Sequence, residues 1–263
     1  MKRVARFSGL VPFALLLVLF FHSYTAKIIP ERPIDNMGLP PVMLWAWERP
    51  VDLEYLDTKR YGVAFLAQTL NLKGDEVIRN PRRQPLHVAP EAKLMAVTRI
   101  ESDKSKAGHA SLSASQRERV VELILKSLEL DSISAIQVDF DAVTSERQFY
   151  RQLLQELRQK LPQQIPLSMT ALASFCVGDR WLKELPVDEA VPMIFRMGSD
   201  DQRIKTMLAK GHDFHEPLCR KSYGIAVDEP FAHRLNDGRR LYVFNARPWT
   251  GSEYAALEEG RLK

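Results

Sequence analysis

The sequence lacks the loop motifs of several large enzyme classes. It contains no Gly-x-Ser-x-Gly elbow, no Gly-x-x-x-x-Gly-Lys phosphate loop and no Gly-x-Gly-x-x-Gly dinucleotide loop. Those glycine patterns are needed where a backbone turns sharply at a nucleophile or approaches a phosphate closely. Their absence argues against an α/β-hydrolase with a serine elbow, a P-loop nucleotidase and a dinucleotide-dependent enzyme of the Rossmann type.

The chain also has little excess charge of either sign. It carries 37 Lys and Arg against 33 Asp and Glu. Three of the bases and none of the acids fall within residues 1–26, so the remainder is near neutral. Nucleic-acid binding requires at least a basic patch. We therefore expect no nucleic-acid partner, and we interpret the short run Asn80–Arg83 as a solvated turn.

Long hydrophobic runs are scarce, and the clearest one lies near the N-terminus. Residues 10–21 are apolar apart from Pro12 and follow Lys2, Arg3 and Arg6. This pattern is typical of an export signal, and at 12 residues the run is short for a membrane span of about 20. Tyr24 is too bulky for a good cleavage site. Residues 1–26 are thus either a cleaved signal peptide or an N-terminal anchor in the bacterial inner membrane.

Downstream, the chain predicts one large α/β domain. Residues 27–41 contain four prolines and resemble a linker. Residues 42–263 alternate strands with helices, which indicates a parallel sheet, and eight strands favour a single closed (β/α)8 barrel of the TIM type. Gly74-Asp75 and residues 76–79 indicate an irregular β excursion between strands two and three. The strands expected are Val42–Trp47, Val63–Leu70, Leu94–Ile100, Ala135–Asp141, Leu167–Leu172, Ala190–Met197, Tyr223–Val227 and Arg240–Ala246.

Helices are expected between several of these strands. The first begins at Ser113 or Ser115 and runs to about Glu129, and the others are Ser145–Lys160, Asp179–Leu185 and Asp200–Lys210. Ser145 and Gln148 have the spacing of a capping box, and Gly211 is typical of the residue that follows a helix.

The run Ile136–Asp141 carries the strongest functional signal. Its strict alternation places Asp139 and Asp141 on one face of a strand, with roughly 6–7 Å between their Cα atoms. Acids at the carboxyl end of a barrel strand are typical catalytic groups. Two other interpretations stay open: solvated or arginine-paired acids, and the Asp-x-Asp of nucleotide-sugar glycosyltransferases, which holds a divalent cation.

Other polar and aromatic residues follow the expected strands. Because the carboxyl ends of barrel strands form one face, these side chains are expected to converge there. Glu101 and Glu229 are candidate catalytic acids beside Asp139 and Asp141. Flat tryptophan rings over polar acids suit a sugar ring, so a carbohydrate ligand is expected. The candidate binding residues are Trp45, Trp47, Glu48, Gln68, Arg99, Gln137, Arg196, Asn245 and Trp249.

Four segments carry a family resemblance. Ile136–Asp141, Pro166–Ser174, Pro186–Gly198 and Val227–Pro230 resemble an uncharacterised bacterial family called domain of unknown function 3142. That resemblance covers most of residues 40–250 and implies no known activity.

The Asp139–Asp141 strand also resembles, more distantly, the Asp-x-x-Asp-x-Asp-x-Glu strand of chitinase-like family 18 glycoside hydrolases. Asp139 and Asp141 match the last two aspartates, but Val143 stands where the catalytic glutamic acid would be. The family 18 mechanism therefore does not carry over. Glu48, Glu101, Glu146 and Glu229 are the alternatives for the missing acid.

The sequence thus predicts an exported, glycoside-hydrolase-like barrel that acts on a bacterial polysaccharide or cell-wall glycan. A non-catalytic glycan-binding barrel and an Asp-x-Asp glycosyltransferase are the alternatives. No cofactor or metal is expected: residues 212–216 with Cys219 contain metal-ligand residue types, yet they fall on the face opposite the expected site. Cys176 follows the fifth expected strand and Cys219 precedes the seventh, so the two cysteines are expected near opposite faces of the barrel. A disulfide between them, although favoured by export, is left open.

Overall fold

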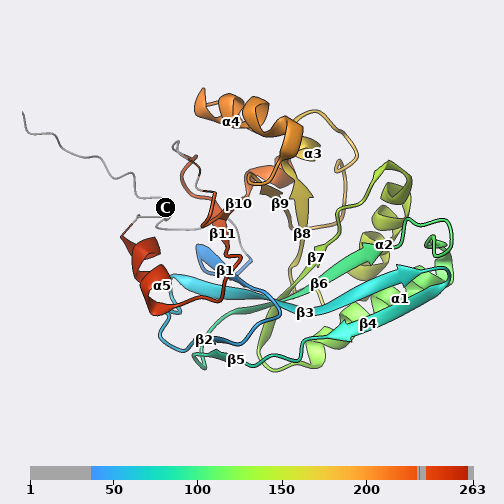
Figure 1. The fold of residues 1–263 in the computed structure, drawn as a ribbon, viewed down its shortest axis with the longest axis horizontal. Helices are drawn as coiled ribbons and strands as arrows, with labels where there is room; N and C mark the ends of the chain where they lie inside the picture. The colour runs from blue at the N-terminus through green and yellow to red at the C-terminus, as the bar shows by residue number, and fades with distance from the viewer. Residues whose placement is uncertain (1–36, 230, 232–234, 260–263) are drawn as a thin grey trace, which may run out of the picture.

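The protein is a closed barrel of eight parallel strands (Figure 1). The computed structural model describes residues 37–229, 231 and 235–259. Strand β1 pairs with both β3 and β11, which closes the sheet, and all neighbouring barrel strands run parallel. This confirms the predicted (β/α)8 fold. The barrel strands are β1 (Val42–Ala46), β3 (Tyr61–Lys73), β6 (Leu94–Ser102), β7 (Ile133–Asp139), β8 (Leu167–Leu172), β9 (Glu189–Met193), β10 (Ser222–Ala226) and β11 (Arg240–Phe244).

The strands bury both of their faces, as strands inside a helix layer must. Every residue of β1 is buried, for example. Alternate residues then belong to two cores: Met43, Trp45 and Tyr242 fill the barrel, whereas Val42 and Leu44 pack against the outer layer. Apolar burial on both sides explains why these strands are nearly continuous hydrophobic runs in the sequence.

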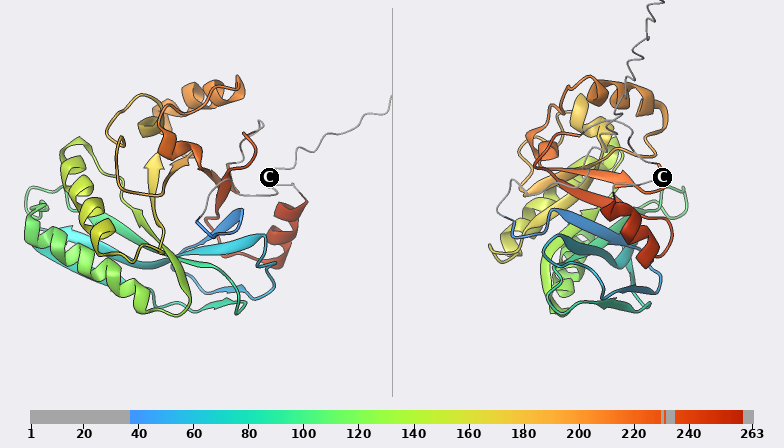
Figure 2. Two further views of the ribbon diagram at one scale, coloured as in Figure 1. Left: turned by 180° about the vertical axis from the view of Figure 1, so that it is seen from behind. Right: turned by 90° about the vertical axis from the view of Figure 1, so that its left-hand side faces the viewer.

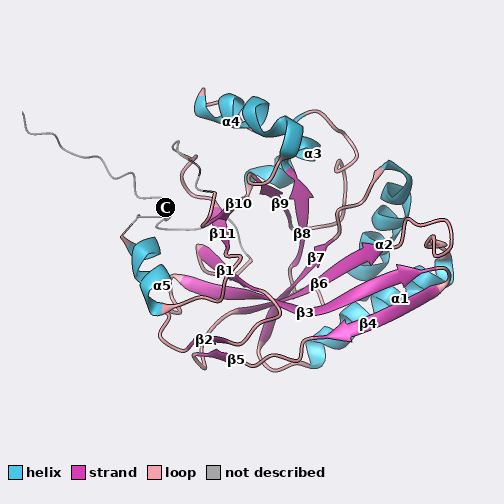
Figure 3. Ribbon diagram, in the orientation of Figure 1, coloured by secondary structure: helices cyan, strands magenta, loops and turns pink. Residues whose placement is uncertain are grey.

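Helices cover only part of the barrel (Figures 2 and 3). They are α1 (Ala114–Leu125), α2 (Arg147–Lys160), α3 (Ala173–Val177), α4 (Asp201–Ala209) and α5 (Gly251–Glu258). Helix α1 is capped by Ser113, whose hydroxyl accepts from the Gln116 N–H, and α1 packs against α2. Each buries an apolar stripe against the outer face of the sheet.

Two expected helix features differ from the structure. The capping box of Ser145 and Gln148 is wrong, because Thr144–Glu146 forms a 3-10 turn before α2, and Glu146 accepts the Val143 N–H instead. The helix expected over Asp179–Leu185 is also wrong. That segment forms turns, and a short helix, α3, occurs directly after β8.

The expected β excursion between strands two and three is confirmed. Strand β4 (Glu76–Pro81) pairs antiparallel with the long β3, beyond Gly74, which has a φ of +52°. Strands β2 (Val51–Leu53) and β5 (Leu86–Val88) form a separate parallel pair. Val51 and Leu53 belong to the outer core, so this pair buries barrel surface where a helix would normally lie.

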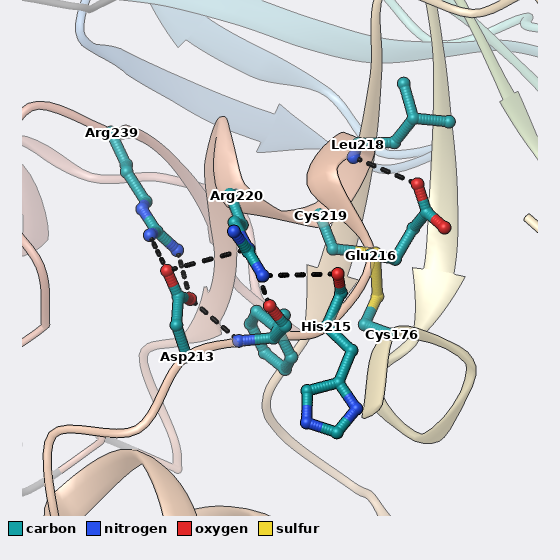
Figure 4. Close-up of a disulfide and its surroundings, with 9 residues drawn as sticks. Cys176, Asp213, His215, Glu216, Leu218, Cys219, Arg220 and Arg239 are labelled. Atoms are coloured by element: carbon teal, nitrogen blue, oxygen red, sulfur yellow. Dashed lines mark hydrogen bonds and ion pairs between the residues drawn. A yellow bond between two sulfur atoms is a disulfide. The ribbon is translucent and has the colours of Figure 1, made fainter. Parts of the chain in front are cut away.

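Cys176 and Cys219 form a disulfide, with their Cα atoms 5.9 Å apart (Figure 4). The expectation that they lie near opposite faces is wrong. Cys176 is in α3, and Cys219 is in the 3-10 turn Pro217–Arg220 before β10. Both segments pack on β9, the strand between β8 and β10, so they meet in the outer layer.

Loss of this disulfide is expected to destabilise the barrel. The Cys176→Ala/Cys219→Ala variant should lose about 2–4 kcal/mol of unfolding free energy, because the bond closes a long loop of the unfolded chain. The sequence separation is 43 residues, and both cysteines are buried. Urea unfolding of the variant and of the oxidised protein measures the difference. Two titratable thiols in the unfolded, unreduced protein would contradict the bond.

The expected export segment, residues 1–26, lies outside the described residues, as does most of the expected linker. Within the described part of the chain, no helix has the length and apolar character to cross a membrane.

Candidate functional site

A pocket of about 830 Å³ opens at the carboxyl ends of the barrel strands. This is the face where barrel enzymes carry their active sites. Its wall is built from segments that follow or end seven of the eight barrel strands. The lining residues are Trp47, Arg49, Arg99, Asp139, Asp141, Leu172, Ala173, Ser174, Met193, Phe195, Arg196, Met197, Gly198, Ser199, Asp200, Ala226, Asp228, Phe244 and Ala246.

Asp139 is a buried carboxylate held by two partners. Oδ2 accepts from Arg99 Nη1 at 2.8 Å, and Oδ1 accepts from the Thr170 hydroxyl at 2.7 Å. Only 3% of Asp139 is exposed, so neither oxygen is free to rotate away without losing a partner. Both carboxylate oxygens therefore act as hydrogen-bond acceptors, one of them in an ion pair. Asp139 is therefore suited to hold a fixed negative charge.

Asp141 differs from Asp139 although it lies only two residues further on. It accepts no hydrogen bond and forms no ion pair with any described residue, and it reaches solvent through the pocket. Removal of water by the pocket walls, and then the negative charge of Asp139, raise the pKa of Asp141 above the usual aspartate value. The positive charges of Arg99 and Lys104 lower the pKa of Asp141, but by less than burial and Asp139 raise it. A carboxyl of this kind can hold and deliver a proton.

Arg99 links Asp139 to Glu101. Its Nε donates to Glu101 Oε1 at 3.0 Å, while its Nη1 binds Asp139. Asp139, Asp141 and Glu101 are thus brought together along adjacent strands β6 and β7. Glu101 is exposed and lies beside the pair, not across the pocket from it.

Aromatic side chains form a second wall of the pocket. Phe195 and Phe244 pack with ring centroids 4.8 Å apart, and Phe244 stacks on Trp45 at 4.5 Å. Trp47 packs against Trp45 at 5.3 Å. Trp45 itself is 1% exposed and supports the other rings from below. Flat apolar rings can stack on the C–H face of a sugar ring, and the nearby carboxylates can bind its polar groups.

Arg196 and Glu229 belong to the rim of the pocket. Arg196, at a φ of +51°, donates from Nη2 to Asp228 and from its backbone N–H to Glu229. Glu229 also accepts from Lys205 of α4. Glu229 therefore fixes the loop before α4 and does not line the pocket, whereas Arg196 does.

Gln68 does not reach the site, so its expected position is wrong. Its side-chain amide donates to Thr98, to the Leu123 carbonyl and to Ser127, all within the outer layer. The pairing of β3 with β6 shifts between Leu66 and Gln68. A bulge inserts one extra residue and reverses which face the following side chains occupy. Simple alternation therefore placed Gln68 on the wrong face.

Three further candidates lie away from the pocket wall. Trp249 is buried in the outer core and donates from Nε1 to the Trp45 carbonyl. Asn245 accepts the Arg247 N–H and shapes the turn after β11. Glu48 accepts the backbone N–H groups of Arg83 and Gln84, which fastens the β1 loop to the excursion.

Val143 stands at the position of the catalytic glutamic acid of the family 18 strand. It is 44% exposed, and its side chain has no proton to donate. Glu146, an alternative donor, is buried and accepts from the Val143 N–H and the Ser102 hydroxyl, so it serves the start of α2. Among the expected acids, the pocket wall retains Asp139 and Asp141.

Gln137 belongs to a polar layer beneath the pocket. It donates to Ser168, which in turn donates to Glu189 Oε1 at 3.1 Å. Glu189 also accepts from Tyr242 and pairs with Arg240 at 3.3 Å, and both members of that pair are fully buried. Burial, and next the charge of Glu189, raise the pKa of Tyr242, which keeps it a donor. Sequence reasoning missed this buried layer.

Residues 212–216 form a folded loop on the outer layer (Figure 4). Asp213 pairs with Arg239, and Arg220 donates to the Phe214 and His215 carbonyls. Arg239 and Arg220 hold the pKa of Asp213 below its usual value although burial alone would raise it. Across the described residues, no group of three or more His, Cys, Asp or Glu side chains is arranged to hold a metal ion.

Comparison with known proteins gives little beyond the fold. No family model matches the chain, and no curated protein matches it, so the resemblance to the uncharacterised bacterial family stays a prediction. Among solved structures, the chain is similar to the spore cortex-lytic enzyme SleL of Bacillus cereus, with 16% identity and a TM-score of 0.46. The match covers 71% of this chain and 51% of that one, so the chain spans about half its length. A similarity this low is not evidence for a shared activity.

Proposed function

We propose that the protein is a glycoside-hydrolase-like barrel whose pocket binds a bacterial glycan and hydrolyses it. One observation supports this most strongly. Two carboxyls at the end of one strand, Asp139 and Asp141, share the pocket, yet Asp139 is bound by Arg99 and Thr170, whereas Asp141 has no such partner among the described residues and has a raised pKa. Paired carboxyls in different environments are the usual means of dividing acid and base roles.

The proposed chemistry assigns one role to each acid. Asp141 donates its proton to the glycosidic oxygen as the bond to the leaving sugar breaks. Asp139, bound by Arg99 and Thr170, stabilises the positive charge that develops on the sugar ring. Trp47 and Phe195 hold the ring from the apolar side. Water completes the hydrolysis and returns a proton to Asp141.

The direct test is turnover of defined glycans. Purified protein should release reducing ends from a bacterial exopolysaccharide or a cell-wall glycan, and the products should be separable by mass. Binding of the same glycan without any release of reducing ends would instead favour a non-catalytic glycan-binding barrel, which the absence of an acid at Val143 supports.

The pH dependence of turnover is expected to follow Asp141. The usual pKa of an aspartate is about 3.9. Because the pKa of Asp141 is raised, its active protonated form persists to higher pH than that and is lost as the pH rises further. The rate should therefore fall on the alkaline side with a midpoint above 3.9. A pH–rate profile of kcat/KM measures that midpoint. A rate that rises with pH through this range would contradict Asp141 as the acid.

A further inference from the structure

Two titratable side chains of the pocket wall stand out because they lack an oppositely charged partner. Arg99 is paired with Asp139, Arg196 with Asp228, and Asp200 with Arg203. Asp141 and Arg49 remain, with no ion pair to any described residue. Asp141 already has a role in the proposed reaction. Of the three arginines in the pocket wall, Arg49 is the one with no ion pair to a described residue.

The backbone that carries Arg49 is firmly held. Its N–H donates to the Trp47 carbonyl at 2.7 Å, and its own carbonyl accepts from Arg82 Nη2 at 2.6 Å. Arg82 also donates to the Trp47 carbonyl at 2.6 Å. The half-buried Arg82, which directly follows β4, therefore fixes the turn that presents Trp47 and Arg49.

Glu48, the residue before Arg49 in the sequence, binds another part of the chain. Glu48 accepts from the backbone N–H groups of Arg83 and Gln84 on the excursion, at 2.8 and 3.2 Å. The Glu48 carboxylate therefore binds the backbone of the excursion and forms no ion pair with Arg49. The guanidinium of Arg49 keeps all five donors for a ligand, in the fork that matches a planar anionic group.

We propose that the glycan bound in this pocket carries an anionic group, a sugar carboxylate or a phosphate monoester, and that Arg49 is the residue that recognises it. This inference rests on the proposed function and defines the substrate class of the same site. Trp47 binds the ring, and Arg49, two residues along, binds the charge.

The test uses uronic-acid oligosaccharides, the same oligosaccharides with their carboxyl groups chemically reduced to alcohols, and phosphate-substituted oligosaccharides. Wild type should bind one anionic set about 10–100-fold more tightly than the neutral set, the range for a hydrogen bond to a charged group. Arg49→Gln should abolish that preference without weakening neutral binding, and Arg49→Lys should restore part of it. Arg83→Gln, which removes an exposed arginine of the neighbouring excursion, is the matched control and should change nothing.

The outcomes separate the two proposals. Dependence on Arg49 for either anionic set supports the inference and identifies the group. Equal binding of charged and neutral oligosaccharides, or an unchanged preference in Arg49→Gln, overturns it while the proposed glycan function stands. If wild type binds none of the oligosaccharides, the proposed function fails and this inference fails with it.

Discussion

Replacement of Glu189 by glutamine is expected to lower the free energy of unfolding by about 3–5 kcal/mol, the cost of breaking a buried ion pair by removal of one partner. Glu189 and Arg240 are both 0% exposed, so water cannot replace the carboxylate charge that the guanidinium loses. For a domain of this size the thermal midpoint should fall by roughly 6–20 °C. Urea and thermal unfolding of wild type and variant measure the effect.

The loss extends beyond the ion pair because Glu189 is the common acceptor of the polar layer. Ser168 and Tyr242 both donate to Glu189 Oε1. An amide oxygen accepts these bonds more weakly than a carboxylate, and the amide N–H₂ opposes Arg240. The layer lies beneath Asp139 on neighbouring strands, so its loosening should also weaken ligand binding in the pocket.

Two controls isolate the buried charge. Glu122→Gln removes a carboxylate from an exposed pair with Arg119 and should leave the free energy of unfolding nearly unchanged. The double variant Glu189→Gln/Arg240→Met removes both charges of the buried pair and should be more stable than the sum of the single changes predicts. Strict additivity, or an equal loss in Glu122→Gln, would contradict this account.

The barrel could be predicted because its strands bury both faces. Each is a short apolar run between turn signals, and helices with helical spacing separate several of them, so the sequence predicts a parallel sheet of eight strands. Strict alternation also predicts that Asp139, the last residue of β7, and Asp141 share one face, and both line the pocket. Such local periodicity depends only on residues next to one another in the chain.

The errors arose where the structure depends on pairing between distant segments. One extra residue in the register of β3 turns Gln68 outward, and no residue type near it signals a bulge. Cys176 and Cys219 meet because two short segments both pack over β9. The ion pair of Glu189 and Arg240 joins residues from two strands, β9 and β11, that are not adjacent. Periodicity within one segment carries no information about such contacts.

Replacement of Asp141 by asparagine is expected to reduce turnover by about 10²–10⁴-fold, the range for loss of a general acid. The thermal midpoint should hold or rise. The raised pKa of Asp141 means that its stabilising contribution is complete below the unfolded-state pKa and is lost as pH rises through the folded-state pKa. At neutral pH the ionised group is therefore unfavourable in the folded protein, and an amide relieves it. Glycan binding should persist, because asparagine has the same shape.

Asp139→Asn provides the contrast that distinguishes chemistry from structure. It should also reduce turnover, but with a loss of about 1–3 kcal/mol in stability, since Arg99 and Thr170 lose a charged acceptor. Arg99 keeps Glu101, which limits the cost. Asp131→Asn, an exposed change before β7 at the other end of the barrel, should affect neither quantity. A large loss of stability in Asp141→Asn, or full turnover in that variant, would exclude Asp141 as the proton donor and leave the pair of acids with a structural role.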